Sequence, residues 1–189
     1  MNQAPSGPAG EWPRIKAMRK AGDVSGLIAE LENPAEWEGS VTLTVRERAI
    51  VELAKLCDSR AVQPIARLLN DKQPTVRTEA AIALGKLGDA SVVAALVHAL
   101  EDPADSVRMG AAKSLGKLGE RSVVPGLIAT LNDKNPWVRM AVARSLARIG
   151  DARAIEALKQ AVKDQGFRHP TIRFRLSKSL WLLRLDRSA

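Results

Sequence analysis

The sequence predicts an all-α fold, an α-solenoid (α–α superhelix) of about five helical hairpins. Two observations predict it. Nearly the same text recurs along the chain, as PTVRTEAAIALGKLGD from Pro74, DSVRMGAAKSLGKLGE from Asp105 and PWVRMAVARSLARIGD from Pro136. Within each copy the apolar residues follow a helical period, which stops at a glycine.

The period of the repeat is 31 residues. Val-Arg pairs begin at Val45, Val76, Val107 and Val138, and an Ile-Arg pair follows 34 residues later at Ile172. A fixed period of this length is typical of a solenoid, in which each unit buries its apolar face only by stacking on its neighbours. We expect the solenoid to be right-handed.

Each unit is expected to be a pair of helices. From Ser91 the apolar positions follow helical spacing until Asp102-Pro103 interrupts the chain, and a second apolar face then runs from Val107 to Gly119. Alanine and glycine are frequent on the second helices, where small side chains allow neighbouring helices to approach closely.

The pattern predicts a disordered tail over residues 1–10 and one repeat domain over 11–189. Its units are about 11–58, 59–88, 90–119, 121–150 and 152–185, with a short capping helix at 12–21. Two turns are longer than the repeat requires, NPAEWEGSVTLT at 33–44 and QGFRHP at 165–170. Loops that depart from a repeat often carry function, but these two can equally belong to terminal units that act as caps.

A charged ladder is predicted along the stack. The Val-Arg arginine falls on the inward side of its helix, where an unpaired cation would cost several kcal/mol. An aspartate stands six residues before it in three repeats, and we expect Asp–Arg pairs in which the aspartates also accept from helix N-terminal amides. The ladder residues are Asp71, Arg77, Asp102, Arg108, Asp133 and Arg139.

The D-x5-R spacing within VRxxAAxALGxLGD resembles HEAT-like repeats of the phycocyanobilin lyase family, over about residues 23–184. The resemblance implies first helices on a convex side and second helices on a concave face. It does not imply one function, since related repeats serve as bilin lyases, DNA glycosylases, iron hydroxylases and scaffolds.

Composition excludes several classes of protein. Apolar runs are too short for a membrane span, and residues 1–14 lack the order of a signal peptide, so we expect a cytoplasmic protein. Cys57 is the single cysteine, at a place where other repeats have glycine, which indicates a structural role. The two histidines lack the glutamate neighbours that iron hydroxylases of this kind use, because Ala99 follows His98 and Pro170 follows His169. We therefore predict no cofactor, no metal and no catalytic residue.

The net charge of +8 lies entirely in residues 95–189, which hold 17 Lys and Arg against 9 Asp and Glu. On a helical wheel, the outward face of the second helices there combines basic side chains with Trp and Met. An exposed Trp flanked by Arg is typical of a binding hot spot, and basic rims attract acidic partners. The predicted partner-binding residues are Met109, Lys113, Lys117, Trp137, Met140, Arg144, Arg148, Arg175 and Lys178.

These observations favour a non-catalytic scaffold, a monomer or part of a hetero-complex, that binds an acidic protein on a basic concave face. Two alternatives stay open. The same groove could bind nucleic acid, although Glu47, Glu52 and Glu79 interrupt it and stacking aromatics are scarce. By the resemblance alone, the chain could also be a bilin lyase subunit or another phycobiliprotein-associated factor.

Overall fold

A computed structural model describes residues 8–32 and 44–163 of the chain. Over these ranges every regular element is a helix and none is a strand, which confirms the predicted all-α class. The chain divides into two compact units, residues 1–87 (unit 1) and 88–189 (unit 2), and each is described by itself.

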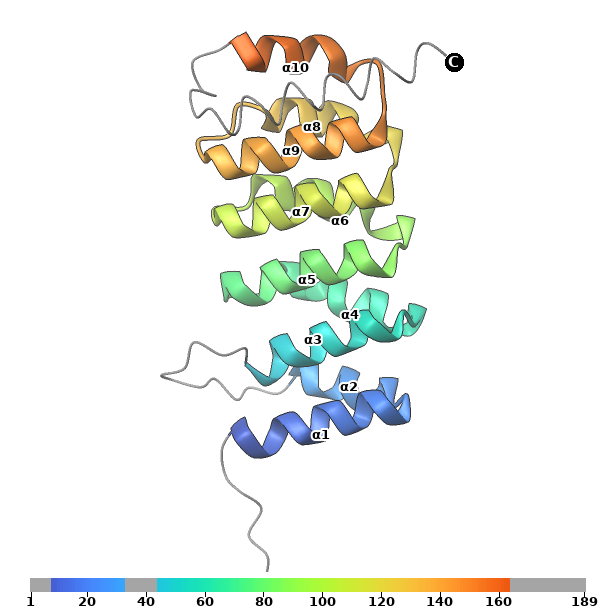
Figure 1. The fold of residues 1–189 in the computed structure, drawn as a ribbon. Helices are drawn as coiled ribbons and strands as arrows, with labels where there is room; N and C mark the ends of the chain where they lie inside the picture. The colour runs from blue at the N-terminus through green and yellow to red at the C-terminus, as the bar shows by residue number, and fades with distance from the viewer. Residues whose placement is uncertain (1–7, 33–43, 164–189) are drawn as a thin grey trace, which may run out of the picture. The chain divides into compact units, whose positions relative to one another are not determined.

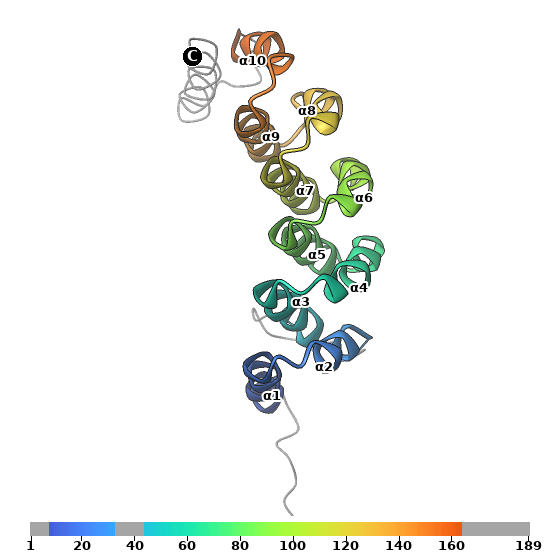
Figure 2. The same cartoon turned by 90° about the vertical axis from the view of Figure 1, so that its right-hand side faces the viewer.

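Unit 1 has two layers of helices, which Figure 1 and Figure 2 show from perpendicular directions. The long-helix layer contains α1 (Pro8–Ala21), α3 (Val45–Leu56) and α5 (Pro74–Leu87). The short-helix layer contains α2 (Val24–Ala29) and α4 (Val62–Arg67), extended by the 3-10 turns η1 (Glu30–Glu32), η2 (Ser59–Ala61) and η3 (Leu68–Asn70). Each hairpin therefore has one short and one long helix.

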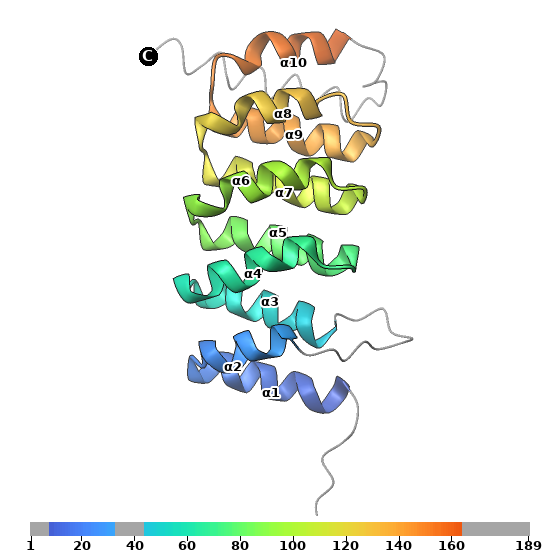
Figure 3. The same ribbon diagram turned by 180° about the vertical axis from the view of Figure 1, so that it is seen from behind.

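Unit 2 repeats this arrangement. Its long-helix layer contains α7 (Asp105–Leu118) and α9 (Pro136–Ile149), which pack side by side. Its short-helix layer, in front in Figure 3, contains α6 (Val93–His98) and α8 (Val124–Thr130), with the 3-10 turns η4 (Ala90–Val92), η5 (Ala99–Glu101) and η6 (Arg121–Val123). The last described helix, α10 (Ala154–Lys163), contacts both α8 and α9.

Local sequence explains where the long helices start and stop. Thr44 and Glu47 form a capping box at the start of α3, in which the Thr44 Oγ1 accepts from the Glu47 N–H at 3.3 Å and the Glu47 carboxylate accepts from the Thr44 N–H at 2.6 Å. At the other ends, Gly119 and Gly150 terminate α7 and α9 with φ of 76° and 73°. This left-handed conformation suits glycine, which has no Cβ to clash.

The core of each unit is built from the same repeat positions. Leu53 and Leu84 are fully buried in unit 1, and Leu115 and Leu146 are fully buried at the corresponding places in unit 2. Each leucine lies on a long helix, and in a repeat of this kind the burial of such positions depends on stacking of neighbouring units.

Small side chains allow α7 and α9 to approach closely in unit 2. The Ser145 hydroxyl of α9 donates to the Ala112 carbonyl of α7 at 2.7 Å. A Cβ placed on Gly116 would lie 2.4 Å from the Ser145 Oγ and 2.8 Å from its Cα, closer than real contacts allow. The glycine at 116 is therefore required by helix packing.

The structure corrects the predicted N-terminal boundary. Helix α1 starts at Pro8, so residues 8–10 are helical and not part of a disordered tail, and the helix is longer than the predicted cap at 12–21. Proline at the first helical position has no N–H to leave unsatisfied, which favours a start there. Both predicted insertions lie outside the described residues, apart from Thr44, which begins α3 as its N-cap.

Candidate functional site

The structure brings together seven of the nine predicted partner-binding residues, on the long-helix layer of unit 2. Since α7 and α9 lie side by side, residues 31 apart in the sequence occupy matching positions on the two helices. Arg175 and Lys178 lie outside the described residues. We call the remaining set the α7–α9 surface: Met109, Lys113, Lys117, Trp137, Met140, Arg144 and Arg148.

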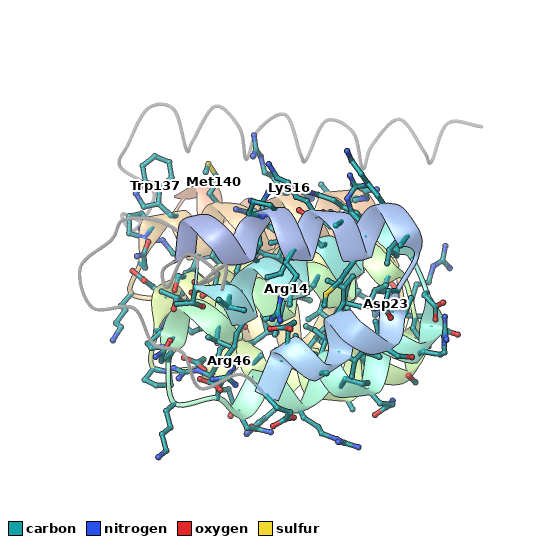
Figure 4. The ribbon with its side chains drawn as sticks, turned by 90° about the horizontal axis from the view of Figure 1, so that it is seen from below. Arg14, Lys16, Asp23, Arg46, Trp137 and Met140 are labelled. Atoms are coloured by element: carbon teal, nitrogen blue, oxygen red, sulfur yellow. The ribbon has the colours of Figure 1, made fainter. Side chains whose placement is uncertain are left out.

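Trp137 is the most conspicuous member of this surface. Its side chain is 56% exposed, and among residues 13–32 and 44–161 it is the only large apolar side chain in that state. The Asn135 side chain accepts from the Trp137 backbone N–H at 2.8 Å, which caps α9 and fixes the position of Trp137 in its first turn. Figure 4 shows Trp137 and Met140, one turn further along, projecting to the same side of α9.

Four exposed cations accompany the tryptophan. Lys113 and Lys117 project from α7, and Arg144 and Arg148 project from α9. Over residues 8–32 and 44–163, none of the four forms an ion pair. Unit 2 as a whole holds 17 Lys and Arg against 10 Asp and Glu. The α7–α9 surface is therefore a region of uncompensated positive charge.

Three described carboxylates of unit 2 are engaged away from this surface. Asp133 binds the guanidinium of Arg108, and Asp151 accepts from Arg153, whose hydrogen bond lowers the pKa of that carboxyl to about 2. Asp105 accepts a hydrogen bond from the Asn135 side-chain amide. Since these acids lie in turns and at a helix start, they do not neutralise the exposed faces of α7 and α9.

The predicted ladder residues lie close together, but they pair differently from the prediction. Each arginine donates to the backbone carbonyl of the aspartate six residues earlier, and not to its carboxylate: Arg77 Nη1 to Asp71 O at 2.8 Å, Arg108 Nη1 to Asp102 O at 2.8 Å and Arg139 Nη1 to Asp133 O at 2.8 Å. A second carbonyl, one residue further along, accepts from the same nitrogen in all three repeats.

The carboxylates of Asp71 and Asp133 instead bind the arginine 25 residues earlier, which belongs to the preceding repeat. In unit 2, Arg108 Nε lies 2.6 Å from Asp133 Oδ2 and its Nη2 lies 3.0 Å from Oδ1. In unit 1, Arg46 Nη2 lies 2.6 Å from Asp71 Oδ2. In both carboxylates Oδ1 also accepts a hydrogen bond from the backbone N–H two residues further along the chain. These donors are Asn135 for Asp133 and Gln73 for Asp71. The ladder thus joins successive hairpins.

Electrostatics of the buried pair follow from this geometry. Burial alone raises the pKa of Asp133, but the hydrogen bonds from Arg108 and from the Asn135 backbone outweigh it, so that the pKa lies below its ordinary value. The pKa of Arg108 is raised by the same interaction. Both groups are held in their charged states, so the pair is structural.

The structure also corrects the prediction that three glutamates interrupt the basic face of unit 1. Glu47 is 4% exposed in its capping box, and Glu52 is 1% exposed among basic side chains. Glu79 is partly buried, and burial raises its pKa, an effect that Lys86 partly offsets and Glu47 reinforces. Two of the three carboxylates therefore contribute little to the exposed charge.

No cluster of three or more His, Cys, Asp and Glu side chains with metal-binding geometry occurs in the part of the chain that the structure describes. His98 is exposed at the end of α6, and His169 lies outside the described residues. Cys57 ends α3 with φ of 53°, at the position that glycine occupies in α7 and α9. Within residues 8–32 and 44–163, no helix has the length and apolar character of a membrane span.

Comparison with known proteins identifies the repeat. A family model described as HEAT repeats matches residues 25–115 and 93–168. A solved structure, the complex of CpcE and CpcF of phycocyanin lyase from Nostoc sp. PCC7120, is similar with a TM-score of 0.70 and 27% sequence identity. The match covers 85% of this chain but only 64% of that chain.

Designed repeat proteins share the fold. A computationally designed armadillo repeat protein for modular peptide recognition is 19% identical with a TM-score of 0.62, and covers 90% of this chain and 86% of its own. A designed armadillo repeat protein in complex with the peptide (KR)4 is 20% identical with a TM-score of 0.63, over the same shares of both chains. Comparison of the sequence with curated proteins finds no match. At these identities the likeness to the designed proteins confirms the solenoid class and carries no function.

Proposed function

This chain belongs to the HEAT-repeat family, and from that premise we propose that it is one subunit of a hetero-complex of the kind that CpcE and CpcF form. In this complex it acts as a scaffold, and its α7–α9 surface binds an acidic protein partner. The proposal assigns binding to this chain and assigns no chemical step to its residues.

The observation that carries the proposal is the exposed Trp137 beside four cations that have no ion pair in the described part of the chain. Interfaces are commonly dominated by a few aromatic and Arg side chains, and burying one such anchor contributes about 2 kcal/mol or more. That energy corresponds to roughly 30-fold in Kd. The surrounding cations add attraction for acidic groups and increase the association rate.

The likeness to the phycocyanin lyase complex supports a hetero-complex as the working state. The relative that matches 85% of this chain was solved as a complex of two different proteins. This chain spans 64% of the length of that matched chain. A phycobiliprotein-related client is the first candidate for the acidic partner, and phycocyanin is the protein to try.

The test compares wild type with Trp137→Ala and with Arg144→Glu/Arg148→Glu, each immobilised and exposed to cell extract with and without nuclease. Proteins captured by the wild type are then purified and titrated individually, together with purified phycocyanin. We expect an acidic protein that binds at least tenfold more weakly to both variants, because one loses the anchor and the other reverses two charges. The matched control is Arg67→Glu, an exposed cation of α4 in the short-helix layer.

Two outcomes would reject the proposal. Equal binding of wild type and both variants would show that the α7–α9 surface is not the interface. Capture of nuclease-sensitive material, with affinity that falls steeply as salt rises, would support nucleic-acid binding instead.

A further inference from the structure

We propose that the long-helix layer of unit 1 holds a second binding site, for the carboxylates of a short acidic peptide segment, formed by Arg19, Lys20, Lys55 and Lys86. This site is independent of the α7–α9 surface. The repeat family does not assign this second site. The repeat pattern in the sequence did not predict it either, because it placed Glu47, Glu52 and Glu79 on this face.

The site is organised by one buried carboxylate. Glu52 of α3 has a side chain that is 1% exposed, and three cations converge on it. Arg19 of α1 places its Nε 2.8 Å from Oε2, while Arg48 Nε and Lys55 Nζ lie 3.2 Å and 2.9 Å from Oε1. One buried negative charge is therefore shared by three positive charges, of which Arg19 and Lys55 belong to the proposed site.

The cations that surround Glu52 remain accessible. The side chains of Arg19, Arg48 and Lys55 are 37%, 23% and 48% exposed, whereas the carboxylate beneath them is shielded. Nε is the Arg19 atom nearest to Glu52, and the two Nη groups make no hydrogen bond to any described residue. A guanidinium edge with two free N–H groups matches the geometry of a carboxylate.

A row of lysines lies beside this cluster. Lys20, Lys55 and Lys86 each stand two residues before the left-handed residue that ends their helix, at Gly22, Cys57 and Gly88. All three are exposed, and adjacent long helices are about 9 Å apart, so the row presents a cation on each successive helix. Figure 4 shows Lys16 of α1 projecting from the side of the helix away from α2, while Arg14 lies between α1 and α2.

Helix dipoles explain some, but not all, of the cations on the long-helix layer of unit 1. A lysine in the last turn stabilises a helix through its negative C-terminal end, which accounts for Lys20, Lys55 and Lys86. It does not account for Arg19, which contacts the Glu52 carboxylate that Lys55 also contacts and whose side chain is 37% exposed. The acidic groups that face the site from α3 and α5 are Glu52, Glu47 and Glu79, all buried or partly buried. Among the side chains that the structure describes, the exposed charges of α1, α3 and α5 are therefore basic.

Charge outside the layer indicates the size of the ligand. Outside the long helices, the described residues of unit 1 hold five acids against three cations: Asp23, Glu30, Glu32, Asp58 and Asp71 against Arg60, Arg67 and Lys72. Beyond a Debye length of about 8 Å at physiological salt, these charges largely cancel and a long polyanion gains little. A short acidic segment that contacts only the layer gains the local attraction without the distant repulsion.

The experiment titrates the full chain with a fluorescein-labelled deca-glutamate peptide. The starting protein carries Arg144→Glu/Arg148→Glu, which disables the α7–α9 surface and leaves unit 1 unchanged. We expect this protein to bind the peptide, and Lys20→Glu/Lys86→Glu in the same background to bind at least tenfold more weakly. Lys20 and Lys86 form no ion pair in the described ranges, and circular dichroism checks that the variant keeps its helices.

Two further variants make the test specific. Arg19→Lys keeps the charge but loses the guanidinium fork, and we expect severalfold weaker binding with an unchanged Tm. Arg67→Glu/Lys72→Glu reverses two exposed cations of unit 1 outside the long-helix layer, and we expect unchanged affinity.

The proposal is overturned if Lys20→Glu/Lys86→Glu binds the peptide like its parent, or if the Arg67→Glu/Lys72→Glu control loses binding equally. Tighter binding of a ten-nucleotide single strand than of the peptide would also reject it, because a nucleic acid would then be the better ligand. Failure here leaves the α7–α9 surface untouched, since that surface is tested by its own variants with its own partner.

Discussion

Arg108 and Asp133 form a bidentate ion pair across two successive hairpins, with side chains only 7% and 8% exposed. Arg108 also donates to two carbonyls of the turn before its own helix, so the guanidinium joins two turns. Both charges are satisfied, and loss of either leaves the other buried without its counter-charge. The pair therefore couples the stability of one hairpin to that of the next.

We predict that Asp133→Asn lowers the free energy of unfolding by about 3 kcal/mol, the cost of leaving a buried charge unpaired. Urea unfolding at pH 7 measures it. Asp58→Asn is the matched control, because Asp58 and Arg60 form an exposed pair on the surface, and it should change stability little. Equal effects at both positions would contradict a special role for the buried pair.

The same pair predicts a pH dependence. The pKa of Asp133 lies below its ordinary value of 3.8, so the folded state binds fewer protons than the unfolded state in acid. Its contribution is complete above the ordinary value and is lost as the pH falls through the lowered pKa. The relevant pH range is roughly 5 to 2. Urea unfolding across this range should show a smaller loss of stability with falling pH in Asp133→Asn than in wild type.

Glu79 predicts a change of stability with pH that is opposite in sign to that of Asp133. Its pKa is raised above the ordinary value of 4.5, chiefly by burial, so the folded state binds the proton more tightly than the unfolded chain does. Stability from this group is present below the ordinary pKa and is lost as the pH rises through the raised one. Glu79→Gln should therefore unfold at higher urea concentration than wild type at pH 7, and the difference should vanish in acid.

Cys57 occupies a left-handed position, with φ of 53°, that other long helices give to glycine. A side chain in this conformation costs roughly 1–2 kcal/mol, so Cys57→Gly should raise the free energy of unfolding by about 1 kcal/mol. Gly119→Ala tests the same rule in reverse. A Cβ there meets no atom within 4 Å, so any loss of stability reports backbone strain alone. Destabilisation by Cys57→Gly would contradict this explanation.

Gly116→Ala should separate α7 from α9, because the added Cβ would meet the Ser145 side chain at 2.4 Å. Overpacking of this kind costs about 1–3 kcal/mol. Gly126→Ala is the control in α8, where the new Cβ would lie 3.6 Å from Val97 Cγ1 in ordinary contact. That substitution should stabilise the helix by roughly 0.5–1 kcal/mol, since alanine is the better helix former. Thermal unfolding of the two variants should therefore shift in opposite directions.

The sequence predicted the helical repeat well because its signals are periodic. The 31-residue spacing of the Val-Arg pairs and the glycine stops at Gly119 and Gly150 reflect packing and backbone geometry that each repeat must satisfy alone. The residues of the α7–α9 surface were predicted from a helical wheel of the repeat. The structure places Lys113 and Arg144 on exposed helix faces, as that wheel predicted. Whether that surface binds a partner stays a prediction.

The pairing of charges could not be obtained from spacing. Asp133 is six residues before Arg139 and 25 after Arg108, and only the direction of each side chain decides which guanidinium meets the carboxylate. The burial of Glu52 was missed for a similar reason, because its partner Arg19 belongs to α1, whose sequence does not repeat the pattern. Counting back two residues from Gly22 would have placed Lys20 in the lysine row.

The inter-hairpin ion pair also determines how such a chain can change in length. Both residue types recur every 31 residues, and Arg46 and Arg108 each bind the aspartate 25 positions ahead. Duplication or excision of one whole repeat therefore presents every remaining arginine with an equivalent aspartate. A gain or loss of a few residues within a repeat instead removes the partner of one buried cation. Genes for such proteins should accordingly grow and shrink in whole-repeat steps, with odd-length insertions confined to the turns.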